Sequence, residues 1–256
     1  MKNLWNSFKI AFSMYSKLPM IQAEWTPENM RYVMCFFPLI GAVIGALQYG
    51  WSWVHPYICE GGVLPAVGYV MIPVLVTGGI HLDGLLDTAD ALNSYQPVER
   101  KLEILKDSHA GAFAIIVGIG YFVLALGVWS ELGQDEVVVL AASYVLSRAL
   151  SGLAVVTFPC AKNSGLVALF SDAAQKARVR ITMIVFAAVC AVGVCVWKLP
   201  YGLAMLAGAG LTYLHYYRMS KKQFGGITGD LAGYFVQLSE LVMAAAVLIA
   251  ARVLGV

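Results

Sequence analysis

Long apolar stretches, separated by short polar segments, run along almost the whole chain. Seven of them are long enough for a helix to cross about 30 Å of hydrocarbon. They lie at about 32–54, 63–82, 110–130, 136–158, 179–198, 201–217 and 232–252. The pattern predicts an all-α fold, a polytopic membrane helical bundle of about seven transmembrane helices, with residues 1–256 as a single integral membrane domain.

Two further segments mix charged and apolar residues at helical spacing. The N-terminal stretch places Lys2, Lys9 and Lys17 among apolar residues and lacks the continuous apolar core and cleavage site of a signal peptide. The segment 96–111 places its apolar residues on one helical face and its charges on the rest. Both segments are predicted to be amphipathic helices that lie along the membrane surface.

Composition agrees with a membrane protein. The chain is 60% hydrophobic and 12% charged, whereas about a quarter of the residues in a soluble domain are charged. The lipid bilayer is therefore an expected partner, and a net charge of +2 indicates no nucleic-acid partner. The five cysteines form no CxxC pair and no Cys/His array, which argues against a zinc site or a disulfide framework.

The distribution of basic residues predicts the orientation of the bundle. With the N-terminus inside, all but three of the 17 basic residues fall on the cytoplasmic side. The three exceptions are Lys198 and Arg252 outside, and Arg148 within the fourth stretch. The polar ends that carry the candidate chemistry then share the cytoplasmic side.

The strongest local signal is GGIHLDGLLDTADAL at 78–92. At about 100° per residue, Asp83, Asp87 and Asp90 fall within an arc of roughly 60° on a helix. Carboxylates at this spacing repel one another unless a cation lies among them. Oxygen-only ligands favour Mg²⁺, with Mn²⁺ as the alternative, over zinc. The competing interpretation is a solvated acidic face where a span leaves the membrane.

A second polar cluster precedes the third apolar stretch. Lys106, Asp107, Ser108 and His109 offer a cation, a carboxylate, a hydroxyl and an imidazole, any of which could contact a phosphate. The alternative is a simple helix cap made by Asp107 or Ser108.

A third cluster opens the last apolar stretch. Gly225, Gly226 and Gly229 predict a flexible turn whose backbone N–H groups could approach a phosphate, with Asp230 directly after it. A tight interhelical loop is the alternative.

Two polar residues follow inside the same stretch, Gln237 and Glu240. A carboxylate at that depth is costly in hydrocarbon, so Glu240 should face the bundle interior and have a partner. Arg148 is the basic residue at comparable depth. Either the two pair, or each contacts a substrate.

These residues stand in strings that resemble a known family, the cobalamin synthases, also called adenosylcobinamide-GDP ribazoletransferases. The strings are FFPLIGAVIG at 36–45, TGGIHLDGLLDTADAL at 77–92, LEILKDSHAG at 102–111, SR at 147–148 and GGITGDLAG at 225–233. The second string is highly specific, and together they run through most of the chain. The resemblance implies a catalytic domain in the bacterial cytoplasmic (inner) membrane, with its active site facing the cytoplasm.

The resemblance also implies the reaction and its residues. A ribose hydroxyl of α-ribazole, or of its 5′-phosphate, would attack the cobinamide-bearing phosphorus of adenosylcobinamide-GDP, and GMP would leave. Metal ions would be held by Asp83, Asp87, Asp90 and, as a fourth carboxylate, Asp230. The base would be an aspartate such as Asp90, or a histidine, His81 or His109. The expected substrate contacts are Lys106, Asp107, Ser108, His109, Arg148, Lys222, Gly225, Gly226, Thr228, Gln237 and Glu240. A homo-oligomer is compatible with this assignment.

Two other functions fit parts of the sequence. A CDP-alcohol phosphotransferase also uses an aspartate helix, but its D-G-x-x-A-R core is not matched, because Asp83-Gly84 is followed by Leu85, Leu86 and Asp87. A membrane transporter would explain buried Arg148 and Glu240. It would not explain why most carboxylates gather at one membrane surface.

Overall fold

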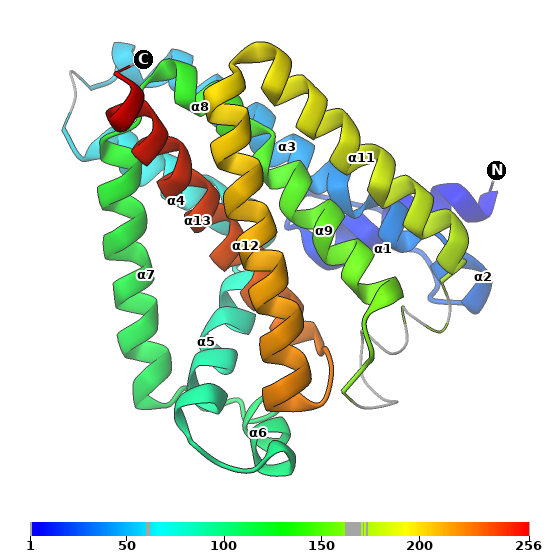
Figure 1. The fold of residues 1–256 in the computed structure, drawn as a ribbon. Helices are drawn as coiled ribbons and strands as arrows, with labels where there is room; N and C mark the ends of the chain where they lie inside the picture. The colour runs from blue at the N-terminus through cyan, green and yellow to red at the C-terminus, as the bar shows by residue number, and fades with distance from the viewer. Residues whose placement is uncertain (1, 60–61, 162–169, 171, 173, 256) are drawn as a thin grey trace.

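The computed structural model describes residues 2–59, 62–161, 170, 172 and 174–255. Helices make up the ordered elements of these residues, as predicted, and the one β-type contact among them is an isolated bridge between Cys160 and Ile227. The helices are α1 (Lys2–Tyr15), α2 (Pro27–Met30), α3 (Val33–Val54), α4 (Leu64–Thr77), α5 (Ile80–Asn93), α6 (Val98–Ile104), α7 (Ala112–Ser130), α8 (Gln134–Ala141), α9 (Ser143–Thr157), α11 (Lys176–Trp197), α12 (Leu199–Phe224) and α13 (Gly229–Leu254), with a 3-10 turn η1 (His55–Tyr57). They pack into one bundle (Figure 1).

The described helices give five spans, or six if one bent pair counts as a span. The five that are long and apolar enough are Val33–Tyr57, Ala112–Ser130, Gln134–Thr157, Lys176–Trp197 and Gly229–Leu254. The predicted count of about seven is therefore approximate. The difference lies in the bent pair and in α12, a 26-residue helix that is not among the five and whose apolar part is interrupted by Tyr201, Tyr213 and His215.

The predicted second span, 63–82, is not one straight helix. The left-handed residues Gly78 (φ 65°) and Gly79 (φ 80°) end α4 and begin α5, and the two helices meet at 95°. Glycine adopts this conformation without the steric penalty of other residues. The aspartate string therefore lies on a separate helix that turns away from α4.

Glycines also bring α5 against α13. A Cβ added to Gly84 would lie 2.5 Å from the carbonyl oxygen of Asp230, and one added to Gly233 would lie 3.0 Å from that of His81. Small residues at such crossings let helix backbones approach closely in membrane proteins. The first turn of α13 is thereby held beside the aspartate helix.

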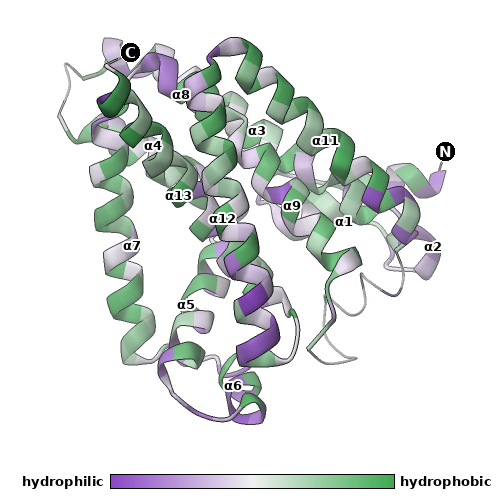
Figure 2. Cartoon of the chain, viewed as in Figure 1, coloured by the Kyte–Doolittle hydropathy of each residue, from purple (hydrophilic) through white to green (hydrophobic). Residues whose placement is uncertain are grey.

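Apolar side chains cover the outer faces of α7 and α11, which are predominantly green in Figure 2. Exposed examples are Ile115, Ile119 and Leu124 on α7, and Ile184 and Val189 on α11. Large exposed apolar surfaces on several helices are what contact with lipid tails requires. The chain is an integral membrane protein.

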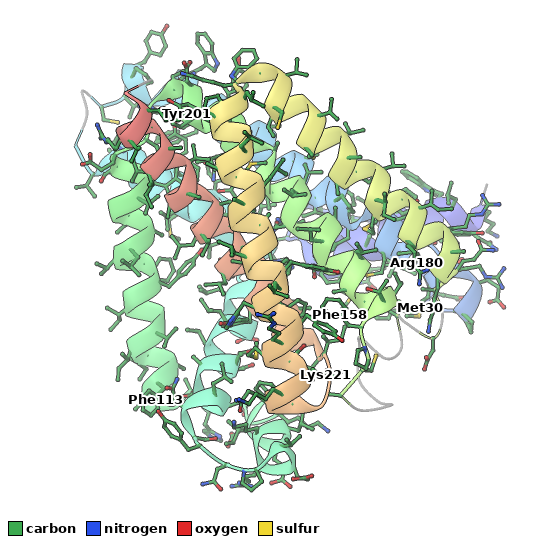
Figure 3. All side chains as sticks on the ribbon, in the orientation of Figure 1. Met30, Phe113, Phe158, Arg180, Tyr201 and Lys221 are labelled. Atoms are coloured by element: carbon green, nitrogen blue, oxygen red, sulfur yellow. The ribbon has the colours of Figure 1, made fainter. Side chains whose placement is uncertain are left out.

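Hydrophilic residues gather around α6 and the end of α12, at one end of the bundle (Figure 2). Lys221 and Phe113 mark this end in Figure 3, and Tyr201 marks the opposite end. The predicted surface helix at 96–111 is shorter than expected, because α6 ends at Ile104, and Lys101 ties it to α12 through a hydrogen bond from its Nζ to Gln223 Oε1 of 2.6 Å.

Candidate active site

Four predicted carboxylates lie together where α5 meets α13. Asp83 is exposed, while Asp87, Asp90 and Asp230 are half-buried. The charges of Asp83, Asp90 and Asp230 all act on the Asp87 carboxylate. Asp230, far along the chain from the other three, joins them because Gly84 allows α13 to approach. The site is thus a cluster of negative charge built by two helices.

Asp90 differs from the other three because it caps a helix. Its Oδ2 accepts a hydrogen bond from the backbone N–H of Gly111 at 2.6 Å, and its Oδ1 accepts one from Ala114 at 2.9 Å. These donors belong to the start of α7, where the first N–H groups have no partner within the helix. The predicted alternative of a cap by Asp107 or Ser108 is wrong, since the capping carboxylate comes from α5.

The other carboxylates are free to take a ligand. Within the described residues neither Asp83 nor Asp87 has a hydrogen bond or an ion pair through its side chain, and Asp230 has only a 3.5 Å contact from the Thr228 hydroxyl. No three acidic, histidine or cysteine side chains in this part of the chain converge as a finished metal site. Mg²⁺ commonly takes only one or two carboxylates and completes its shell with water and substrate phosphates. The oxygen donors fit that mode of binding.

Two cavities meet at Asp83. The larger, about 560 Å³, lies between α1 and the turn from α4 to α5, and is lined by Lys17, Thr77 and Gly79 among others. The smaller, about 280 Å³, lies between α1, α3, α5, α9 and α13, and Asp230 also lines it. A substrate that occupied both cavities would pass the carboxylates.

His81 borders the smaller cavity. It is 4% exposed, and neither ring nitrogen has a hydrogen-bond partner among the described residues. The imidazole lies parallel to the Tyr15 ring, with 6.2 Å between ring centroids and 5° between planes, and 5.6 Å from the Phe37 ring. The structure brings His81 to the same site as Asp83 and Asp230, although it points to another face of α5.

The second predicted cluster is at the surface. Lys106, Asp107, Ser108 and His109 are all exposed. Asp107 Oδ1 accepts hydrogen bonds from the His109 backbone N–H at 3.0 Å and contacts its ring Nδ1 at 2.8 Å. The hydrogen bond from the His109 backbone N–H, and next the hydrogen bond with the His109 ring, hold the pKa of the Asp107 carboxyl below its usual value. His109 is thus the more solvent-accessible of the two histidines predicted as bases.

Arg148 and Glu240 pair inside the bundle. Arg148 is fully buried, and its Nη1 lies 2.7 Å from Glu240 Oε1, which also accepts a hydrogen bond from the Ser147 hydroxyl at 2.8 Å. The Arg148 Nε and Nη2 have no partner among the described residues. Gln237 accepts a hydrogen bond from the Tyr121 hydroxyl at 2.5 Å. Of the two alternatives for Arg148 and Glu240, the structure contains the pair, and substrate contact by these residues stays a prediction.

The glycine turn is a tight interhelical loop. Gly225 ends α12 with φ 74°, and the buried Gly226 donates its N–H to the Ser220 carbonyl at 3.1 Å. The hydroxyl of Thr228 caps α13 by accepting from the Leu231 N–H at 3.2 Å. Lys222 is exposed at the end of α12. A substrate role for these four residues is still a prediction, but Gly226 and Thr228 already serve the fold.

The comparison with known proteins settles the family. A family model described as cobalamin-5-phosphate synthase matches residues 7–248. The chain belongs to this family. The match includes every residue of the carboxylate cluster, both cavities and the Arg148–Glu240 pair, so the cobalamin-5-phosphate synthase assignment rests on the part of the chain that builds the site. It replaces the phosphotransferase and transporter alternatives.

Similar proteins carry one common name. The chain is 46% identical over 249 residues to the adenosylcobinamide-GDP ribazoletransferase of Lachnoclostridium phytofermentans, covering 97% of this chain and 95% of that protein. It is 31% identical to the proteins of the same name from Clostridium perfringens and Desulfitobacterium hafniense, covering 94% of this chain and 96% and 94% of those proteins. No solved structure matches significantly.

Sequence reasoning missed the contribution of α1 to the site of this cobalamin-5-phosphate synthase family member. Lys17 and Tyr15 line the two cavities from the end of α1, and the Lys17 backbone N–H donates to the Val76 carbonyl at 2.7 Å. From the amino-acid sequence, Lys17 is predicted only as part of an amphipathic helix at the membrane surface. No local signal would have found this role, because it depends on the side chain of Lys17 packing against Gly78 in the turn before α5.

Proposed function

We propose that this chain joins α-ribazole, or its 5′-phosphate, to adenosylcobinamide-GDP and releases GMP, a late step of cobalamin nucleotide-loop assembly. The observation that carries the proposal is the carboxylate cluster of Asp83, Asp87 and Asp230 beside two cavities, in a chain of this family. Two cavities that share one carboxylate suit a reaction that joins two substrates.

The reaction exchanges one P–O bond for another. A ribose hydroxyl oxygen of the nucleoside attacks the phosphorus that bears cobinamide, the bond from that phosphorus to the GMP oxygen breaks, and GMP leaves with the electron pair. The hydroxyl proton passes to a carboxylate at the cavity, for which Asp83 and Asp230 are the candidates. Asp90 is a weaker candidate because both of its oxygens already accept hydrogen bonds from α7.

The same carboxylates are the proposed ligands of a divalent cation, Mg²⁺ or Mn²⁺. Asp83 and Asp87 have no internal partners among the described residues, and oxygen donors suit these ions. When bound, such an ion neutralises charge on the diphosphate and on the departing GMP. Without one, the clustered carboxylates would repel a phosphate group.

Lys17 is the proposed cationic contact to the diphosphate. It lines the larger cavity together with Thr77 and the left-handed Gly79, next to Asp83. A lysine ammonium binds phosphate as a point charge. It would offset the negative potential of the carboxylates on the side where the diphosphate enters.

The proposed location is the cytoplasmic face of a bacterial inner membrane. Lys221 marks the end of the bundle formed by α6 and the end of α12 (Figure 3), with the exposed Lys222 next to it in α12 and the exposed Lys106 just after α6. At the opposite end, Lys198 pairs with Asp135 at 3.2 Å and Arg252 pairs with Glu131 at 2.6 Å. Among the described residues these three lysines form no ion pair, whereas Lys198 and Arg252 do, so the unpaired positive charge favours the end that the positive-inside rule assigns to the cytoplasm.

Purified protein in detergent or lipid tests the proposal. With Mg²⁺, adenosylcobinamide-GDP and α-ribazole, we expect GMP and the joined corrinoid to form in equal amounts, and excess chelator to stop both. Release of CMP from a CDP-alcohol, without GMP release, would favour the other enzyme class. Full turnover in chelator would refute the metal site but leave the transfer reaction in place.

A further inference from the structure

The smaller cavity has the character of a pocket for an aromatic group. Its walls include the side chains of Tyr15, Phe37, Met34 and Val155, contributed by α1, α3 and α9. Its volume of about 280 Å³ lies near the lower end for small-molecule pockets. It can hold one fused two-ring base, but neither a corrinoid nor a dinucleotide.

His81 lines the cavity, and both of its ring nitrogens are buried without a hydrogen-bond partner among the described residues. A neutral imidazole carries one N–H donor and one acceptor nitrogen, and neither is used by the described residues. Buried polar groups in proteins almost always have a partner, so the unpaired imidazole of this cavity-lining residue can take one from a ligand when its ring turns toward the cavity. The Tyr15 and Phe37 rings, whose centroids are 4.5 Å apart, pack together against one side of the imidazole and restrict its orientation.

From these observations we infer that the smaller cavity binds the bicyclic base of α-ribazole, and that His81 donates a hydrogen bond to the free ring nitrogen of that base. This inference rests on the proposed function. The base of α-ribazole is a dimethylbenzimidazole, which has one free ring nitrogen and an otherwise apolar surface. The cavity offers the same combination, one unpaired imidazole among apolar and aromatic walls.

The guanine of the other substrate fits this cavity poorly. Guanine presents N7 and O6 as acceptors and its amino group as a donor, and each would lose its water on entry. Away from the carboxylates at the rim, the polar side chains of the cavity are few, namely His81, Ser151 and the Tyr15 hydroxyl. Guanine would therefore leave buried polar atoms unpaired, whereas dimethylbenzimidazole would not.

The positions of the two cavities also indicate where each substrate lies relative to Asp83. Asp83 and Asp230 line the smaller cavity, and Asp83 lines the larger one as well. A nucleoside with its base among Tyr15, Phe37 and His81 can direct its ribose toward these carboxylates. The diphosphate of the second substrate then lies on the side of Lys17. In this arrangement His81 is a positioning residue, and the proton acceptor is a carboxylate.

Filling the cavity tests where the base binds. Val155→Phe reduces the space between α9 and α1, and we expect it to raise the KM for α-ribazole about tenfold or more while the KM for adenosylcobinamide-GDP stays nearly unchanged. The control is Val185→Phe, the same substitution on the exposed face of α11, which should change neither KM. An equal rise in both KM values, or no rise, would overturn the assignment.

A base analogue tests the hydrogen bond and does not depend on the cavity-filling variant. The wild-type enzyme should prefer α-ribazole over an indole riboside, in which the free ring nitrogen is replaced by C–H, by about tenfold or more in kcat/KM. In His81→Phe this preference should fall to near unity, because the rate with α-ribazole drops toward that of the analogue. Retention of the wild-type preference in His81→Phe would refute the role of His81. Failure of the wild-type enzyme to release GMP with either nucleoside would instead refute the proposed function.

Discussion

Asp83 and Asp90 stand about two turns apart on α5, and their carboxylates meet different surroundings. Both carboxylate oxygens of Asp90 accept hydrogen bonds from the N–H groups of Gly111 and Ala114. Asp83, in contrast, lines two cavities and has no hydrogen-bond or ion-pair partner among the described residues. The same side chain is therefore expected to serve stability at one position and chemistry at the other. The sequence spacing alone treats them as equivalent.

Asp83→Asn and Asp87→Asn should each abolish or nearly abolish transfer, with a loss of about 10²-fold or more, while the protein stays folded. Asparagine keeps the shape and removes like-charge repulsion, so the thermal unfolding midpoint should stay constant or rise. Rates of GMP release at saturating Mg²⁺ and melting curves in detergent measure the two effects. Wild-type rates in both variants would leave the solvated acidic face as the correct interpretation of the cluster.

Asp90→Ala should behave differently, because it removes the cap of α7. Loss of a helix cap costs about 0.5–2 kcal/mol of stability, so the unfolding midpoint should fall, in contrast to Asp83→Asn. The comparison of melting curves for the two variants separates the roles. A midpoint for Asp90→Ala equal to that of the wild type would show that the cap contributes nothing.

At the scale of the helices, the site depends on how closely α5 and α13 approach. Gly84 faces the Asp230 carbonyl, and Gly233 faces the His81 carbonyl, so no side chain separates the two backbones. The left-handed Gly78 and Gly79 set the direction in which α5 leaves α4. Gly84 and Gly233 thus allow α5 and α13 to pack closely, and this packing places Asp230 beside the aspartates of α5.

Gly84→Ala should lower both stability and activity. A Cβ at this position would lie 2.5 Å from the Asp230 carbonyl oxygen, and such overpacking costs about 1–3 kcal/mol. The matched control is Gly120→Ala in α7, where a Cβ meets nothing within 4 Å and alanine should stabilise the helix by roughly 0.5–1 kcal/mol. Unfolding midpoints and GMP release in both variants check the expectation. Equal behaviour of the two alanines would contradict the close approach.

The buried pair of Arg148 and Glu240 ties α9 to α13. Breaking it with Arg148→Met should cost about 3–5 kcal/mol, because Glu240 would be left as an uncompensated buried charge. Adding Glu240→Gln to Arg148→Met should recover part of that loss. A double-mutant cycle on unfolding free energies measures the coupling. If the two losses simply add, the pair does not stabilise the fold.

For the molecule as a whole, three basic residues fall outside the side that we predict to be cytoplasmic, and each has an acidic partner. Lys198 contacts Asp135, Arg252 contacts Glu131, and Arg148 contacts Glu240. Pairing offsets the charge of each exception. The exposed Lys106, Lys221 and Lys222, which form no ion pair among the described residues, lie at the hydrophilic end of the bundle around α6 and the end of α12 (Figure 2).

Reporter fusions test this orientation. A reporter after Ser94 or after Lys222 should be cytoplasmic, and one inserted near Gly133, between α7 and α8, should be periplasmic. Fusions in whole cells, with a reporter active on one side only, give the measurement. The reverse labelling at any of the three places would overturn the cytoplasmic assignment of the active site.

Hydropathy over twenty residues and helical spacing are local properties, so they were enough to predict the membrane bundle and the three aspartates on one face of α5. The sequence also supplied the pairing of Arg148 with Glu240 as one of two alternatives, since a deep charge needs a partner. The folded arrangement of the helices was needed to learn that Asp90 caps α7, and that His81 lies at a cavity shared with α1. Those outcomes depend on contacts between helices far apart in the chain, and on glycines whose packing partners no local pattern reveals.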